Sequence, residues 1–183
     1  MELVANWNWS STISKLFYQP PMKRTFLWSI DDKEPIRTFC LNLPHLYFLI
    51  NYTSALDSRD FWVLGSFIFG SSEKIEKLTD KVFAMPLPNV KYHGGICLGN
   101  GLKLYTSDSE LIEKSIDRLY NASGNEDSVP VSVREYISRR TNYEFFQDLS
   151  KASPDIWKKL DTNIVIQNHV MPGIDFIFNS FEK

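Results

Sequence analysis

The sequence predicts an α+β protein in which the β-strands come first along the chain and the helices follow. Short β-prone runs separated by turn-forming clusters fill the first third. A segment rich in Pro, Gly and Asn comes next, and the clearest helical periodicity begins only at Ser107. Because strands and helices are segregated along the chain, we expect an antiparallel sheet with helices packed on it.

Four strands are expected in the first third of the chain. The β-prone segments are residues 24–30, 36–43, 46–52 and 61–69. The second segment alternates in character, which places Cys40 and Asn42 on one face and Phe39, Leu41 and Leu43 on the other. We predict that the four segments form one antiparallel meander. Residues 1–15 show no clear periodicity and are a poor helix.

The clearest helix is expected over residues 107–120. Either Ser107 or Ser109 can cap its N-terminus, and Glu110 stands three residues after Ser107, as in a capping box. The helix then carries an apolar stripe. The stripe consists of Leu111, Ile112, Ser115, Ile116, Leu119 and Tyr120.

The last part of the chain is expected to be mainly helical. Residues 133–149 are a second helix candidate and residues 154–160 a short third one, whereas residues 163–181 form a strand or an irregular return. The length fits a single domain over residues 1–183. We place its core at about 24–122 and a helical C-terminal extension at 123–183.

Composition and charge exclude several classes of function. The formal net charge of -2 argues against a dedicated nucleic-acid binder. No segment reaches the roughly 18 apolar residues that span a bilayer, and the N-terminus lacks the features of a secretory signal. We therefore expect a cytoplasmic protein that binds neither nucleic acid nor membrane. Two cysteines are too few for a disulfide framework or a cysteine-rich zinc site, so we expect free thiols, no metal and no cofactor.

Residues 87–100, with the sequence LPNVKYHGGICLGN, carry the candidate chemistry. Cys97 lies eight residues after Asn89, and two glycines between them suit a tight turn. An exposed cysteine can act as a nucleophile in its thiolate form. A side-chain amide close to it can stabilise a developing oxyanion. Asn89 is equally open to interpretation as a turn residue.

Three neighbouring residues have expected supporting roles. Pro88 stiffens the approach to Asn89. His93, four residues before Cys97, is either a base for the thiol or a turn residue. Cys40 lies inside a β-prone run, and we expect it to be a structural thiol without chemistry.

The same segment resembles the active-site region of ubiquitin-conjugating enzymes. That family carries a His-Pro-Asn triplet, a turn glycine and an Ile-Cys-Leu triplet around its acceptor cysteine. The matching positions here are Pro88, Asn89, Gly94, Ile96, Cys97 and Leu98. A wider stretch resembles the bacterial ubiquitin-conjugating-like family found as protein B of plasmid PRTRC-type systems. It consists of residues 43–50, 78–90 and 94–100.

The resemblance implies a UBC-like fold, in which a four-stranded antiparallel meander is followed by an ordered active-site loop and then by helices packed on the sheet. It implies a transferase that accepts a ubiquitin-like modifier as a thioester on Cys97 and passes it to an amine, with Asn89 as the oxyanion donor. The implied partners are a ubiquitin-like protein, an adenylating protein resembling an activating enzyme, and a protein target. The supporting loop residues are Pro88, His93, Gly94, Gly95 and Leu98.

The chain departs from the family pattern at two positions and leaves other functions open. Leu87 stands in place of the triplet histidine, and Gly99 in place of an acidic residue. Asp108 and Asp117 are both candidates, by position alone, for the residue that gates the incoming lysine. One alternative is a catalytically inactive scaffold of the same fold that binds a ubiquitin-like protein. The other is an unrelated α+β interaction protein of a mobile element, in which Cys97 is incidental.

Overall fold

A computed structural model describes residues 1–9, 11–28, 36–54, 61–91, 93–97, 107–121, 142–160 and 164–170. Within these residues the protein is mixed α and β with mostly antiparallel sheet, which confirms the predicted class. The strands are β1 (Glu2–Trp9), β2 (Thr12–Gln19), β3 (Met22–Trp28), β4 (Arg37–Leu43), β5 (His45–Ser54), β6 (Phe61–Ser71), β7 (Lys81–Ala84) and β8 (Ile164–Val165). The helices are α1 (Asp108–Asn121) and α3 (Asn142–Lys151), with the 3-10 helices η1 (Pro154–Lys159) and η2 (Ile166–His169).

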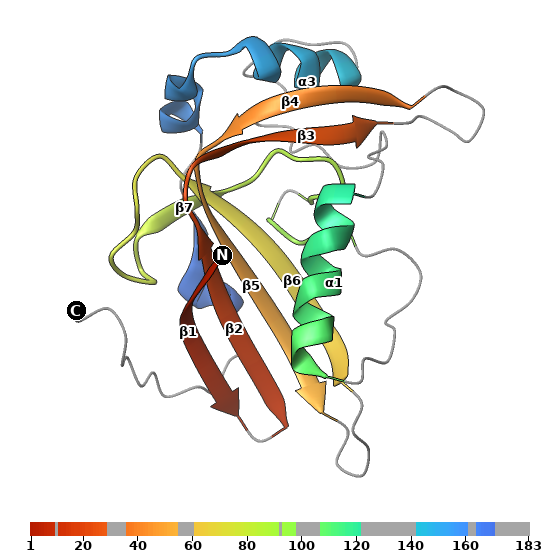
Figure 1. The fold of residues 1–183 in the computed structure, drawn as a ribbon. Coiled ribbons are helices and arrows are strands. Elements are labelled where there is room, and N and C mark those ends of the chain that lie inside the picture. The colour runs from red at the N-terminus through yellow and green to blue at the C-terminus, as the bar shows by residue number, and fades with distance from the viewer. Residues whose placement is uncertain are drawn as a thin grey trace.

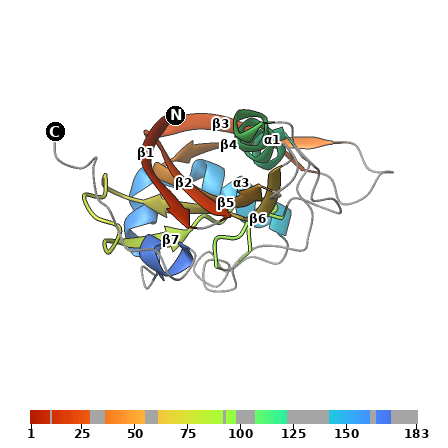
Figure 2. The same cartoon turned by 90° about the horizontal axis from the view of Figure 1, so that it is seen from below.

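The strands form two sheets. A curled six-stranded sheet has the order β1-β2-β5-β6-β7-β8, and β3 and β4 form a separate two-stranded sheet (Figure 1). Every neighbouring pair is antiparallel. Figure 2, which views the molecule from below, shows α1 on one side of the large sheet.

The two sheets share one long, bent hairpin. Gln19 pairs with Leu46 in the large sheet, and three residues further along each strand Met22 pairs with Leu43 in the small one. The register is therefore continuous across the interruption. The residues at the interruption include Pro20, Pro21 and Pro44. Because proline has no N–H to donate to a ladder, these residues divide the hairpin between two sheets.

This topology corrects the predicted meander. The segments at 36–43 and 46–52 do not pair with each other, because β4 and β5 follow one another along the same arm of the bent hairpin, and β5 pairs with β2 instead. Strand β1 and the start of β2 occupy residues 1–15, in which the sequence shows no clear periodicity. A register shift between Leu3 and Ala5 interrupts the alternation along β1, which explains why the pattern is hard to read.

Each face of the six-stranded sheet has its own apolar core. The first core joins α1 to the large sheet and continues over the β3-β4 sheet to α3 and η1. Its largest members include Phe26, Trp28, Phe39, Phe48, Tyr52, Phe83 and Tyr120. The second core lies on the other face and includes Tyr18, Tyr47, Leu49, Phe69, Ile75, Leu78 and Ile166. Burial of these side chains is the main stabilising contribution to the fold.

Helix α1 agrees closely with the prediction from sequence. The Glu110 N–H donates to Ser107 Oγ at 3.2 Å, so Ser107 is the capping residue. Five members of the predicted stripe are buried, and Ile112 is half-buried. The buried members are Leu111, Ser115, Ile116, Leu119 and Tyr120. The buried Ser115 hydroxyl is satisfied within the helix, because Ser115 Oγ donates to the Leu111 carbonyl at 2.8 Å.

The described C-terminal elements contact both sheets. The Phe146 ring of α3 stacks on Phe39 of β4, with ring centroids 4.7 Å apart. The indole N–H of Trp157 in η1 donates to the Asn42 carbonyl at 3.0 Å, and β8 pairs with β7. Of the helix predicted at 133–149, residues 133–141 lie outside the described residues.

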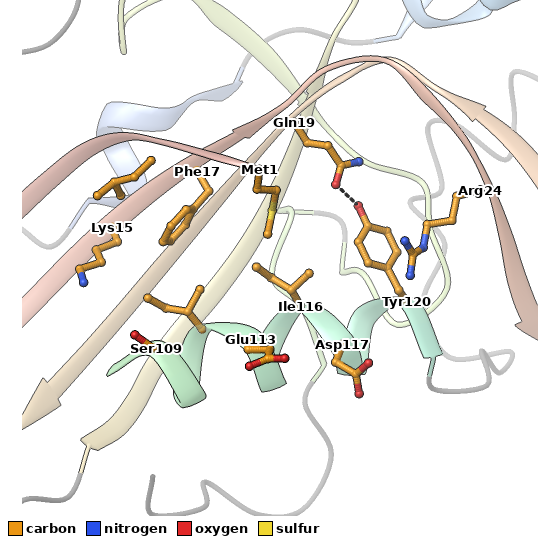
Figure 3. Close-up of a pocket in the computed structure, with 12 residues that line it drawn as sticks. Met1, Lys15, Phe17, Gln19, Arg24, Ser109, Glu113, Ile116, Asp117 and Tyr120 are labelled. Carbon is orange, nitrogen blue, oxygen red and sulfur yellow. Dashed lines mark hydrogen bonds between the residues drawn. The ribbon is translucent and has the colours of Figure 1, made fainter. Parts of the chain in front are cut away.

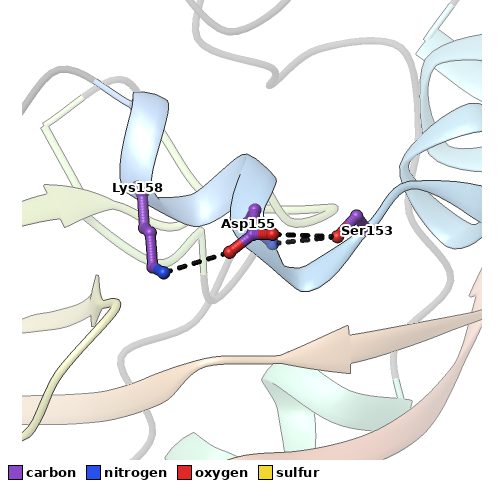
Figure 4. Close-up of polar contacts among 3 residues, drawn as sticks. All are labelled: Ser153, Asp155 and Lys158. Atoms are coloured by element: carbon purple, nitrogen blue, oxygen red, sulfur yellow. Dashed lines mark hydrogen bonds and ion pairs between the residues drawn. The ribbon is translucent and has the colours of Figure 1, made fainter.

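The 3-10 helix η1, which follows α3 in the chain, has a small polar cap at its N-terminus. Ser153 Oγ accepts the Asp155 N–H at 3.4 Å, and the Asp155 carboxylate contacts Lys158 Nζ at 3.1 Å (Figure 4). The hydrogen bond and charge of Lys158 lower the pKa of Asp155. Because both side chains are exposed, this pair orders the turn and adds little stability. The predicted short third helix at 154–160 is confirmed as this 3-10 turn.

No helix in the described part of the chain is both long enough and apolar enough to cross a membrane.

Candidate functional site

The segment that carries the candidate chemistry, residues 87–100, follows β7 in the chain, and its described part returns to β6. The Gly94 carbonyl accepts the Ile68 N–H at 2.8 Å, and the Ile96 N–H donates to the Ser66 carbonyl at 2.7 Å. Within β6, only Phe69 and Gly70 pair with β7. The returning segment pairs with the next part of β6, where Gly95 forms a β-bridge with Phe67. The segment is therefore ordered by backbone hydrogen bonds to a central strand.

The segment folds back on itself so that Asn89 and Cys97 lie opposite each other. The Cys97 N–H donates to the Asn89 carbonyl at 2.7 Å, and Val90 forms a β-bridge with Ile96. Lys91 closes the reversal, since its N–H donates to the Gly95 carbonyl at 2.8 Å. The two residues that the sequence singled out are thus joined through the backbone.

Asn89 has a backbone conformation that most residues avoid. Its φ is 62°, and it is the only non-glycine residue with a positive φ among those described. Asparagine tolerates this left-handed region better than other residues with a Cβ atom. The conformation gives Asn89 a structural role that is separate from any role of its side-chain amide.

Both turn glycines have close neighbours, and Gly94 also has a backbone conformation that favours glycine. Gly94 has a φ of 85°, and a Cβ atom there would lie 2.7 Å from Phe69 Cε1 and 3.0 Å from the Ile68 carbonyl oxygen. At Gly95 a Cβ atom would lie 2.4 Å from Cε1 of His93. The His93 ring also accepts the Gly95 N–H on Nδ1 at 3.2 Å. His93 therefore serves as a turn residue in this structure, one of its two predicted roles.

Gly94→Ala is expected to lower the free energy of unfolding by about 1–3 kcal/mol. The new Cβ atom would be strained at a positive φ, and it would also lie too close to the Ile68 carbonyl oxygen. Chemical denaturation measures the change. Gly65→Ala is the control, because its nearest neighbour is the Phe67 ring at 3.0 Å, which can shift. Equal losses in the two variants would contradict this account of the turn.

The two cysteines differ in exposure. Cys97 is exposed, whereas Cys40 is half-buried in β4. Leu87 and Pro88, which lead into the site, are buried. Leu87 is fully inaccessible and belongs to the first core, so an apolar residue stands where the resembled family has histidine. Leu98 and Gly99 lie outside the described residues.

The two candidates for a lysine-gating residue both fall on α1. Asp108 is the first residue of the helix, and Asp117 is exposed two turns further along. Asp117 lines a groove between α1 and the β1-β2 hairpin (Figure 3). Nothing in the described geometry connects it to Cys97.

An aromatic cluster that the sequence did not reveal supports the loop. The Phe67 ring lies between His93, at 6.1 Å between centroids, and His169, at 5.1 Å. His169 also packs on Phe69 at 5.0 Å, and its carbonyl accepts the Asn51 side-chain N–H at 3.1 Å. Local sequence patterns cannot reveal these contacts, because they join segments that lie far apart in the chain.

This cluster predicts an acid-dependent loss of stability. Burial first, and then the charge of His93, lower the pKa of His169 from its usual 6.5. As the pH falls below 6.5, the unfolded chain takes up a proton that native His169 resists. The free energy of unfolding therefore decreases with falling pH until native His169 also becomes protonated.

His169→Gln is expected to reduce this pH dependence. Urea denaturation at pH 7.5 and at pH 5.5 measures it as the difference between the two free energies of unfolding. His45, whose pKa is also lowered by burial, remains in the variant and keeps its own contribution. An unchanged difference would show that His169 does not couple protonation to folding.

Among the described residues, no group of three or more His, Cys, Asp or Glu side chains is placed to hold a metal ion. Comparisons of the chain with protein-family models, with curated proteins and with solved structures found no match.

Proposed function

We propose that this protein is a ubiquitin-conjugating-enzyme-like transferase that carries a ubiquitin-like modifier as a thioester on Cys97. The observation that carries the proposal is the exposed Cys97 whose N–H is bound to the Asn89 carbonyl at 2.7 Å. Pro88-Asn89 and Ile96-Cys97 provide the sequence match at the same place. An exposed thiol in an ordered turn is accessible to a macromolecular substrate.

The proposal includes a UBC-like architecture. Strands β2, β5, β6 and β7 are four consecutive antiparallel neighbours. The loop with Cys97 follows β7 in the chain, and α1 then packs against β6. This order of sheet, thiol loop and helix supports the expected arrangement, although its strands differ from those predicted from sequence.

The first chemical step is transthiolation. The Cys97 thiolate attacks the carbonyl carbon of the modifier, which arrives as a thioester on the activating protein. A new carbon–sulfur bond forms to Cys97, and the bond to the activating protein's sulfur breaks. That sulfur leaves as a thiolate, so the step needs neither an oxidant nor a metal. The activating protein consumes ATP earlier, when it adenylates the modifier.

The second step transfers the modifier to an amine of the target. The amine nitrogen attacks the thioester carbonyl, the carbon–sulfur bond breaks, and an amide bond forms. The amine loses its proton to solvent or a base, and the Cys97 thiol is regenerated. In the intermediate the carbonyl oxygen becomes an oxyanion, which the Asn89 side-chain amide is proposed to stabilise.

A charging assay tests the function. The protein is mixed with ATP, the adenylating protein and the ubiquitin-like protein encoded nearest to its gene, and the products are separated on non-reducing gels. We expect an adduct that disappears when thiol is added. If both partners are active with each other and no adduct forms, the inactive scaffold becomes the better proposal.

A further inference from the structure

Within the described residues, helix α1 leaves part of its face of the six-stranded sheet open. It packs against β6 and β3, whereas β1 and β2 extend the sheet beyond it. A groove of about 610 Å³ lies between the helix and the β1-β2 hairpin (Figure 3). This volume is within the range of about 300–1,000 Å³ that is typical of ligand sites.

The groove combines apolar side chains with charges of both signs. Leu3 and Phe17 from the hairpin and Ile112 and Ile116 from α1 provide its apolar surface. Leu3 is 48% exposed, so part of this apolar surface is open to solvent. The charged residues are Lys15 and Arg24 on the sheet side and Glu113 and Asp117 on the helix side.

One end of the groove is closed by a polar cluster. The Tyr120 hydroxyl donates to Gln19 Oε1 at 3.1 Å, and the Arg24 guanidinium lies 3.8 Å from the centre of the Tyr120 ring. Burial raises the pKa of Tyr120 to about 12, so the hydroxyl keeps its proton and remains a donor. The cluster holds this wall in place in the absence of any occupant.

We propose that the groove docks an amphipathic α-helix of a partner protein, which lies beside α1 on the β1-β2 hairpin. A helix about 10 Å wide covers roughly two strands spaced about 4.8 Å apart, so β1 and β2 offer room for one more helix. The charges select its chemistry, because an apolar stripe with carboxylates on one flank and cations on the other complements both walls. An anionic lipid or fatty acid lacks cations for Glu113 and Asp117. The inference is independent of the chemistry at Cys97.

Synthetic helical peptides provide the first test. Three labelled peptides share one leucine stripe, and their flanks carry Glu on one side and Lys on the other, Glu on both, or Lys on both. By fluorescence anisotropy, we expect saturable binding of the mixed peptide, about fivefold tighter than either of the others. The double variant Glu113→Lys, Asp117→Lys is expected to prefer the all-Glu peptide instead.

Two matched substitutions locate the binding. Leu3→Asp is expected to weaken the mixed peptide about tenfold or more. Leu64→Asp, on β6 outside the groove, is the control because Leu64 is 47% exposed and should leave binding unchanged. The proposal is overturned if no peptide binds saturably, or if Leu3→Asp and Leu64→Asp have the same effect on binding. It is also overturned if the Glu113→Lys, Asp117→Lys variant prefers the same peptide as the unmodified protein. Displacement by laurate together with indifference to the charges would assign the groove to a small amphiphile instead.

Discussion

Cys97→Ala is expected to abolish the thiol-sensitive adduct completely while the fold remains intact. The variant removes the sulfur atom that is proposed to hold the thioester, and because Cys97 is exposed, the change leaves no buried cavity. Circular dichroism and the denaturation midpoint verify the fold, and the charging assay measures the adduct. Cys97→Ser is expected to form a smaller amount of an oxyester that resists thiol.

Cys40→Ala is the matched control for this result. It removes the other free thiol, which is half-buried in β4, and it should charge as the unmodified protein does. An adduct that survives in Cys97→Ala and disappears in Cys40→Ala would place the thioester on Cys40 and contradict the proposal. An adduct that survives in both would place the linkage on another side chain.

Asn89→Ala is expected to slow the discharge of the modifier to a free amine about 100-fold or more, with a smaller effect on charging. Discharge forms the oxyanion that the side-chain amide is proposed to stabilise. Single-turnover chase of the charged protein with lysine measures the rate, and the charging assay measures the first step separately.

Asn89→Gly separates the two roles of this residue. Glycine adopts a φ of 62° without strain, so it keeps the backbone turn and loses only the amide. We expect both variants to discharge slowly, and only the alanine variant to lose about 1–2 kcal/mol of stability as well. If the glycine variant discharges at the unmodified rate, Asn89 serves the turn alone and the oxyanion assignment is wrong.

Local sequence patterns predicted the elements that are stabilised locally. Helix α1 was recognisable because its cap, Ser107, and its apolar stripe lie within one short segment. Strands β3 to β6 were likewise found from β-prone runs bounded by turn residues, whereas β1, β2 and β7 were not. The pairing of the four strands was not predicted, because Pro20, Pro21 and Pro44 divide the hairpin between two sheets, and β5 pairs with β2, which lies before β3 and β4 in the chain.

The candidate site shows the same division. The reversal between Asn89 and Cys97 was predicted from the two glycines, and the structure contains it. The positive φ of Asn89 and the packing of His169 on Phe67 and Phe69 could not be predicted, since both are set by tertiary contacts. The exposure of Cys97 also depends on which strand receives the loop.

The loop is attached to β6 through main-chain atoms, and this has a consequence for how the protein can change during evolution. Backbone hydrogen bonds tolerate most side-chain replacements, so mutations can accumulate along the loop without detaching it. Positions with a conformational requirement, such as Asn89 and Gly94, and the buried Leu87 and Val90 resist change for structural reasons. Distant relatives are therefore expected to share the spacing of a few such positions and little overall identity.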